Sequence, residues 1–382
     1  MRICMLTHNL KDDNGNGVLS LHVFRGLHNG LGAEVMALTT VGSGVPFEKS
    51  ILYPNKLKLI AALPRIRRII KDCDVVHALD AYPYGIVAGL AAYGLKKKII
   101  VTAVGTGSIQ LLYHHHWPGT QLVKWSYRQA ARITAISRFT RDSILRQMPE
   151  LRIDVINPGV HYEAFAVKGG EEKDADARIT VRGSTGENYG VDDLRPYILS
   201  VGSIRWRKGY KVSLKAFALI HEQFPELKYV IVGKRYAEKY YEELLRIIRE
   251  LHLEQSVVIL DRVDTFEALR ALYRNAELFC LLSQNFGHDV EGFGIVFLEA
   301  AAAGLPVVGS IENGIEDAVE DGINGFLVNC RDEKGFADKI MAIVGDRRLH
   351  AEMGKASLAR AKVSSWDRRN AQYQELYRKL LG

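Results

Sequence analysis

The segment Asp289-Val-Glu-Gly-Phe-Gly-Ile-Val-Phe-Leu-Glu299 combines two glutamates with a Gly-Phe-Gly turn and the start of a small-residue helix. Gly292 and Gly294 let the backbone approach a ligand closely, and the start of the helix offers N–H groups to it. Glu291 precedes the helix and Glu299 falls in its second turn, so the carboxylates lie about 10 Å apart along a ligand. This arrangement favours an extended nucleotide-sugar with its diphosphate between them.

Two glutamates at this spacing also occur on ordinary surface helices, so the pair alone is weak support. The interpretation gains weight from its surroundings, which run from Leu281-Leu-Ser to Pro306-Val-Val.

The composition is that of a soluble globular protein of two ordinary domains. The chain has 382 residues, 47% of them hydrophobic and 25% charged, and no apolar run long enough to cross a bilayer. The N-terminus becomes polar after six residues, so we expect no signal peptide and a cytoplasmic protein. The four cysteines are scattered, which predicts reduced packing residues. The net charge of +7 favours phosphate-bearing partners or an anionic surface.

Short apolar runs alternate with amphipathic segments, which indicates βαβ units on parallel sheets. The predicted strands are 3–6, 34–38, 75–77, 99–102, 133–136 and 154–156, followed by 197–201, 229–232, 257–260, 278–282 and 307–308. Residues 168–193 interrupt the pattern and read as a linker or insertion. We therefore predict an α/β chain with Rossmann-like domains at 1–167 and 194–364, and a C-terminal helix at 365–382 that packs back on the first domain.

Two loops have the composition of phosphate-binding loops. Arg205, Arg207 and Lys208 follow a predicted strand, where cations can hold a diphosphate and stabilise its charge as it leaves. Gly15 and Gly17 follow the first strand and permit a tight turn near a phosphate. No third glycine and no suitably placed acidic residue follow them, which disfavours a nicotinamide-dependent dehydrogenase. A solvated basic loop and a flexible glycine loop are the plain alternatives.

The remaining charged clusters leave alternatives open. Asp289, Glu291 and Glu299 do not have the spacing of a compact metal site, and the histidines at 114–116 would bind metal only adventitiously. Residues 56–71 form a basic amphipathic segment that fits either an anionic membrane or the solvated face of a domain helix. The basic residues lack the interleaved aromatics of a nucleic-acid platform.

Taken in order, these motifs resemble the retaining glycosyltransferases of family 4, which have the GT-B fold, with two Rossmann-like parallel-sheet domains facing a cleft. The resemblance runs nearly end to end and rests on segments 15–22, 74–77, 136–137, 156–160, 205–209, 291–306 and 320–326. The short string Asp289-Val-Glu-Gly-Phe-Gly most resembles bacterial mannosyltransferases that act on phosphatidylinositol mannosides.

The resemblance implies a role for each donor-side position. Glu299 would accept hydrogen bonds from the ribose, and Glu291 would sit near the donor sugar, whose hydroxyls meet the amides of Phe293 and Gly294. Lys208 would hold the diphosphate, together with Arg205 or Arg207, because Ser203 stands where the family often has an arginine. Gly15 and Gly17 would line the diphosphate from the first domain. Arg205, Lys208 and Glu291 are the residues expected to take part in the reaction.

The acceptor side departs from the family pattern. His77 is expected at a strand end, lining the cleft, and Val104 and Gly105 are the other expected acceptor-side positions. Many relatives carry a histidine in place of Val104 and an aspartate in place of Gly107, so the departure implies an altered acceptor specificity or an inactive member.

The implied function is transfer of a hexose from a GDP- or UDP-sugar to a lipid or saccharide acceptor, with mannose the favoured sugar. The resemblance implies retention of configuration and no metal or other cofactor. We expect the chain to act in the cytoplasm, with peripheral contact to an anionic membrane and no nucleic acid partner. A nucleotide-sugar epimerase or hydrolase, a phosphorylase and a binding protein without activity are the alternatives.

Overall fold

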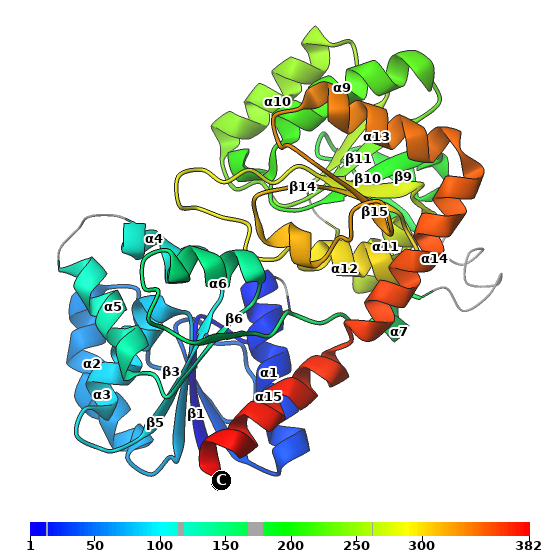
Figure 1. Ribbon diagram of the computed structural model, residues 1–382. Helices are drawn as coiled ribbons and strands as arrows, with labels where there is room; N and C mark the ends of the chain where they lie inside the picture. Colours follow the sequence, from blue (N-terminus) through cyan, green and yellow to red (C-terminus); the bar gives the residue numbers. More distant parts are fainter. Residues whose placement is uncertain (13, 114–117, 167–178, 262) are drawn as a thin grey trace. The chain divides into compact units, whose positions relative to one another are not determined.

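The computed structural model describes residues 1–12, 14–113, 118–166, 179–261 and 263–382, and the chain forms two compact units (Figure 1). Unit 1 comprises Met1–Gly159, Gly287–Phe293 and Trp366–Gly382. Unit 2 comprises Val160–Phe286 and Gly294–Ser365. The first unit therefore ends eight residues before the predicted boundary, and it also takes in a short segment from the later part of the chain.

Unit 1 is built on a seven-stranded parallel sheet with the order β3-β2-β1-β4-β5-β6-β7. Its strands are β1 (Arg2–Thr7), β2 (Glu34–Thr39), β3 (Glu48–Ser50), β4 (Val75–Leu79), β5 (Lys98–Ala103), β6 (Arg132–Ala135) and β7 (Ile153–Val155). The central strands are buried on both faces, as continuous apolar runs in a parallel sheet require, and the side chains of Ile3 to Leu6 are all inaccessible.

Helices flank this sheet, and the C-terminal helix belongs to the same unit. They are α1 (Gly15–Leu31), α2 (Lys56–Ile70), η1 (Ala81–Gly85), α3 (Ile86–Ala92), α4 (Thr106–Tyr113), α5 (Gly119–Gln129), α6 (Arg138–Leu145) and α15 (Trp366–Leu381). Figure 1 shows α15 in red beside α1 in blue. Gly26 and Gly30 of α1 make the close approach possible, because a Cβ at either would meet the side chains of Asn370 and Gln374 within 2.2 Å and 2.0 Å.

Unit 2 has a six-stranded parallel sheet with the order β12-β11-β10-β13-β14-β15. Its strands are β10 (Tyr197–Val201), β11 (Lys228–Val232), β12 (Val257–Leu260), β13 (Leu278–Leu281), β14 (Val307–Ser310) and β15 (Gly325–Val328). Its helices are α7 (Tyr162–Phe165), η2 (Asp192–Leu194), η3 (Trp206–Lys208), α9 (Tyr210–Gln223), α10 (Glu238–Glu250), α11 (Phe266–Asn275), α12 (Ile295–Ala302), η4 (Gly314–Asp317), α13 (Glu333–Gly345) and α14 (Arg347–Val363).

Both sheets share one topology. Counted along the chain within each parallel sheet, the first six strands in unit 1 and the six strands in unit 2 follow the order 3-2-1-4-5-6, which is the Rossmann arrangement. In each unit the order reverses beside the first strand, at β1 and β4 in unit 1 and at β10 and β13 in unit 2. Ligands of such sheets bind at the carboxyl ends of the strands at this point.

Part of the segment 168–193, which was predicted to be a linker or insertion, has regular structure. Residues 180–190 form an antiparallel hairpin of β8 (Thr180–Arg182) and β9 (Asn188–Gly190). Ser184 fixes the hairpin to unit 2, because its N–H donates to the carbonyl of Ile259 and its hydroxyl bonds the hydroxyl of Tyr241, both at 2.8 Å. Residues 168–178 and the histidines at 114–116 lie outside the described residues.

Within the described residues, no helix is both long enough and apolar enough to span a bilayer. All four cysteines are free, and Cys4, Cys73 and Cys280 are buried.

Candidate functional site

The loop after β10 packs on the loop after β13, at the point where the strand order of unit 2 reverses. The N–H of Gln284 donates to the carbonyl of Arg207 at 2.7 Å. Gly209 adopts φ 71°, and a Cβ there would lie 1.9 Å from the carbonyl oxygen of Leu282. Only glycine fits this close, left-handed position, so Gly209 fixes the path of the preceding basic residues.

The three cations of this loop differ in their surroundings. The side chains of Arg207 and Lys208 are only 7% and 8% exposed, whereas the Arg205 guanidinium lies over the Tyr236 ring at 5.3 Å. Lys208 crosses Gly202, where a Cβ would come within 3.2 Å of its Cε atom. Cations held at strand ends create a positive site that suits a diphosphate. Ser203, in the same loop, is partly exposed.

Glu299 lies in the second turn of α12 and accepts a hydrogen bond from the Tyr273 hydroxyl at 2.8 Å. Burial raises the pKa of Glu299, and the hydrogen bond from Tyr273 lowers it. Gly294 stands at the N-cap of α12 with φ 81°, a conformation that side chains disfavour, and Phe293 before it is buried. Ser203, the basic loop, Gly294 and Glu299 all belong to unit 2.

The glycines after β1 have a structural role inside unit 1. The helix α1 already begins at Gly15, which is exposed, and the N–H of Gly17 donates to the Asn14 side chain at 2.9 Å. A Cβ at Gly17 would lie 2.0 Å from the carbonyl oxygen of Lys11. The amide of Gly17 is therefore used as a helix cap, which differs from its expected approach to a diphosphate.

Val104 and Gly105 lie beside the segment that carries Glu291. A Cβ at Gly292 would come within 2.6 Å of the Val104 carbonyl oxygen, and one at Gly105, where φ is 139°, within 3.5 Å of the Gly292 Cα atom. The Thr106 hydroxyl donates to Asp289 at 3.0 Å. Glu291 is 8% exposed in this setting. The predicted acceptor-side pair therefore lies against Gly292, the residue that follows Glu291.

His77 is not where the sequence pattern suggested. The strand β4 continues two residues past it, and its side chain is fully buried. Its Nε2 atom bonds the Thr102 hydroxyl at 2.7 Å and its Nδ1 atom bonds the Tyr377 hydroxyl at 2.9 Å. Burial lowers the pKa of His77 to about 3, so the ring is neutral at physiological pH. His77 is a core residue under α15 in this structure, with no accessible surface for an acceptor.

Asp80 lies at a position typical of ligand-binding residues, and it was not predicted from the sequence. It follows β4 at the switch point of unit 1 with φ 101°, a strained value for a non-glycine residue. It accepts a hydrogen bond from the Ser108 hydroxyl, and burial raises the pKa of Asp80 to about 6. A Cβ at Gly107 would lie 2.5 Å from its Oδ2 atom, which explains the glycine there. The available signal was an acidic residue directly after an apolar strand.

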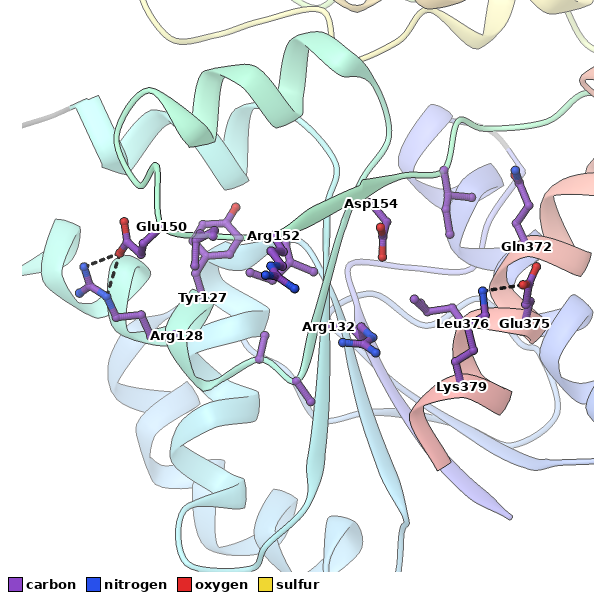
Figure 2. Close-up of a pocket in the computed structure, with 15 residues that line it drawn as sticks. Tyr127, Arg128, Arg132, Glu150, Arg152, Asp154, Gln372, Glu375, Leu376 and Lys379 are labelled. Carbon is purple, nitrogen blue, oxygen red and sulfur yellow. Dashed lines mark hydrogen bonds and ion pairs between the residues drawn. The ribbon is translucent and has the colours of Figure 1, made fainter. Parts of the chain in front are cut away.

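A groove of about 700 Å³ in unit 1 runs along β7 and α15 (Figure 2). Ion pairs of Arg128 with Glu150 and of Lys379 with Glu375 neutralise much of its charge. Its floor includes Arg132, the first residue of β6, so it opens toward the edge and amino end of the sheet. The groove is thus remote from the strand ends that bind ligands in this topology.

No cluster of three or more histidine, cysteine, aspartate or glutamate side chains that could hold a metal ion is present in the part of the chain that the structure describes.

The chain thus has two Rossmann-like units, and the second carries a cationic loop and a carboxylate at its switch point. This arrangement is typical of a class of two-unit α/β enzymes. The fold matches that of solved structures such as HepE from Anabaena in complex with UDP and glucose, with a TM-score of 0.79. The identity there is 18%, over 99% of this chain and 100% of that chain, so the match defines the fold, which is GT-B.

Sequence comparisons define the family. Residues 14–164 match the family described as Glycosyltransferase Family 4, and residues 185–360 match Glycosyl transferases group 1. The chain belongs to the family 4 glycosyltransferases, which are sugar-transferring enzymes.

Two relatives illustrate the range of the family. A GDP-mannose-dependent alpha-(1-6)-phosphatidylinositol monomannoside mannosyltransferase of Mycolicibacterium smegmatis is 28% identical, over 82% of this chain and 78% of its own length. An N-acetyl-alpha-D-glucosaminyl L-malate synthase of Bacillus anthracis is 25% identical, over 95% of this chain and 93% of its own length.

Proposed function

We propose that the chain transfers a hexose from a nucleoside-diphosphate sugar to a lipid or glycan acceptor, with retention of configuration and without a metal ion. The observation that carries the proposal is the packing of the Arg205–Lys208 loop against the loop after β13, where the Gln284 N–H bonds the Arg207 carbonyl at 2.7 Å. This packing supports a diphosphate site at the switch point of unit 2.

The basic loop accounts for departure of the leaving group. As the bond between the sugar and the diphosphate breaks, negative charge grows on the diphosphate oxygens, and Lys208 with Arg205 or Arg207 would stabilise it. The amides of Phe293 and Gly294 would hold the sugar hydroxyls. A leaving oxygen stabilised in this way can take the acceptor proton on the face from which it departs. Such a reaction retains configuration without a dedicated carboxylate base.

Glu299 would bind the ribose hydroxyls, and Glu291 the transferred sugar. A GDP-sugar with mannose is our favoured donor, supported by the named donor of the mycobacterial relative. The named product of the Bacillus relative involves a different sugar and a small-molecule acceptor, so a panel of donors is the appropriate test.

Thermal unfolding of the purified chain with nucleotides and nucleotide-sugars, with and without magnesium, tests the donor assignment. We expect one nucleoside diphosphate and its sugar to raise the melting temperature, equally with EDTA present. The Glu299→Ala variant should lose this shift, whereas Glu277→Ala, which removes a carboxylate that faces Arg347 and His350 in the same unit, should keep it. A folded chain that no nucleotide stabilises would contradict the proposal and favour a binding protein.

Helix α2 supports a membrane-associated acceptor at the cytoplasmic face. Leu57 and Ile60 are 77% and 60% exposed on this helix, beside Lys56 and Lys58, while Ile66 is buried against the unit. Apolar side chains flanked by cations suit an anionic bilayer surface. Co-sedimentation with phosphatidylglycerol vesicles should fall several-fold in a Leu57→Glu variant, with phosphatidylcholine vesicles as the uncharged control. Equal binding by the variant and the parent would contradict this surface.

A further inference from the structure

The Tyr273 hydroxyl donates a hydrogen bond to Glu299, and the Tyr273 ring is held rigidly inside unit 2. The helix α11 begins at Phe266 and is capped by Thr265, whose side chain accepts from the N–H of Ala268, and it buries its second half against the sheet. The Tyr273 side chain is fully buried, with Phe165 edge-on at 5.5 Å and Phe279 tilted at 5.9 Å. Because two rings confine the phenol, its hydroxyl has one fixed direction.

That direction leads to Oε2 of Glu299, 2.8 Å away. Among the described residues Glu299 has no other hydrogen-bond partner, and its side chain is partly exposed. One carboxylate oxygen is therefore held by the protein, and the other is left to accept a hydrogen bond from a ligand. The next residue, Arg274, donates to the carbonyls of Phe165 and Ala166, which anchors the end of α11 and with it the phenol.

We propose that Tyr273 is a positioning residue for the donor nucleotide, which fixes the orientation of the Glu299 carboxylate toward the ribose hydroxyls. The proposal rests on the assignment of Glu299 to the ribose made above. A phenol is suited to this task because it donates one proton and carries no charge. A lysine or arginine at the same place would form an ion pair and compete with the ribose for the second oxygen.

The electrostatics favour this role. Burial raises the pKa of Glu299, which on its own would bring protonation closer to neutral pH, and the Tyr273 hydroxyl opposes that rise. Burial and the negative charge of Glu299 raise the pKa of Tyr273, so the phenol keeps its proton and remains a donor. A carboxylate accepts hydrogen bonds from both ribose hydroxyls, whereas a protonated acid loses part of that capacity.

The test is the affinity of the Tyr273→Phe variant for the nucleoside diphosphate that stabilises the parent, measured by calorimetry between pH 5 and 8. The ring packing is preserved and only the hydroxyl is lost. We expect affinity at pH 7 to fall by about tenfold, as for a hydrogen bond to a charged group. The loss should grow as the pH is lowered, because the variant's Glu299 protonates at a higher pH than the parent's.

Tyr229→Phe is the matched control. Tyr229 is fully buried in the same unit, and its hydroxyl bonds Ser200 at 2.8 Å and Ser213 at 3.1 Å, with no acidic partner. The control should lose stability comparably and bind nucleotide with the parent's pH profile. A purely structural Tyr273 would give the same result as this control, which would overturn the proposal.

The Glu299→Gln variant separates the two proposals. The amide keeps an acceptor for Tyr273 but cannot ionise, so its nucleotide affinity should be weak and independent of pH, and adding Tyr273→Phe should change it less than twofold. If Glu299→Gln weakens binding and Tyr273→Phe does not, the positioning role fails and the ribose assignment stands. If neither variant weakens binding, the ribose assignment itself fails.

Discussion

The two units share the strand order 3-2-1-4-5-6 and differ in what stands at their switch points. Unit 2 carries the cations Arg205, Arg207 and Lys208 there, on a loop fixed by backbone contacts. Unit 1 carries the carboxylate of Asp80. The shared topology gives each unit a switch point, and the opposite charges there are the reason that we place the proposed diphosphate site in unit 2.

The largest expected effect comes from removing a cation of the basic loop at the switch point of unit 2. Lys208→Ala should lower the transfer rate by about 10²–10³-fold, as does loss of one donor to a developing negative charge. Measurement of turnover at saturating donor checks this. Lys215→Ala removes a cation of α9 that is paired with Glu333 of α13 and should leave turnover within about twofold. Equal effects of the two variants would show that the charge difference between the units does not drive the reaction.

The second prediction concerns how rigidly the unit 2 loop is held. Gly209→Ala should destabilise the protein by more than about 3 kcal/mol, because strain at positive φ adds to a clash with a backbone carbonyl. Gly322 has a similar φ of 74° but open space around it, so Gly322→Ala should lose only about 1 kcal/mol. Urea unfolding measures both. Equal losses would mean that backbone strain alone, without the packing on Leu282, accounts for the effect.

The third prediction addresses the core of unit 1. Since burial depresses the pKa of His77 to about 3, its contribution to stability is complete above the unfolded value of about 6.5 and is lost as the pH falls toward 3. The difference in unfolding free energy between the parent and His77→Gln should therefore shrink over this range. A difference that stays constant with pH would mean that His77 does not resist protonation.

The smallest expected effect has the opposite sign. The raised pKa of Asp80, about 6, means that its contribution is complete below the unfolded value of about 4 and is lost as the pH rises through 6. Relative to Asp80→Asn, the parent should become less stable from pH 4 to pH 7. Denaturant titrations across that range measure the slope. If the difference in unfolding free energy between the parent and Asp80→Asn does not change with pH, water solvates Asp80 well and the electrostatic difference between the two switch points is absent.

Sequence patterns predicted the sheets well where burial is complete. All predicted strands are present within two residues at each end, because parallel strands covered on both faces read as apolar runs. The strand β3 was missed because its residues, Glu48 to Ser50, are polar and lie at the edge of the sheet. The hairpin after residue 179 was missed because its attachment depends on Ser184, whose partners are distant in sequence.

Only the parts of the candidate site that depend on residues close together in the sequence could be predicted. The basic loop follows from its glycines and lysine, and Glu299 from its position in α12. The partners of these residues do not follow, because Tyr273 meets Glu299 through the packing of two helices. The error at His77 has the same origin, since its burial depends on Tyr377, 300 positions later.

That distance also sets a limit on folding during synthesis. At about 5–20 residues per second, a ribosome needs roughly 15–60 s to advance from His77 to Tyr377. Until then the nascent unit 1 lacks α15, and the α1 surface around Gly26 and Gly30 has no cover. Unit 2, all of which precedes α15 in the chain, is able to close first. Unit 1 therefore begins before unit 2 but is completed after it, which reverses the usual order of assembly from the N-terminus.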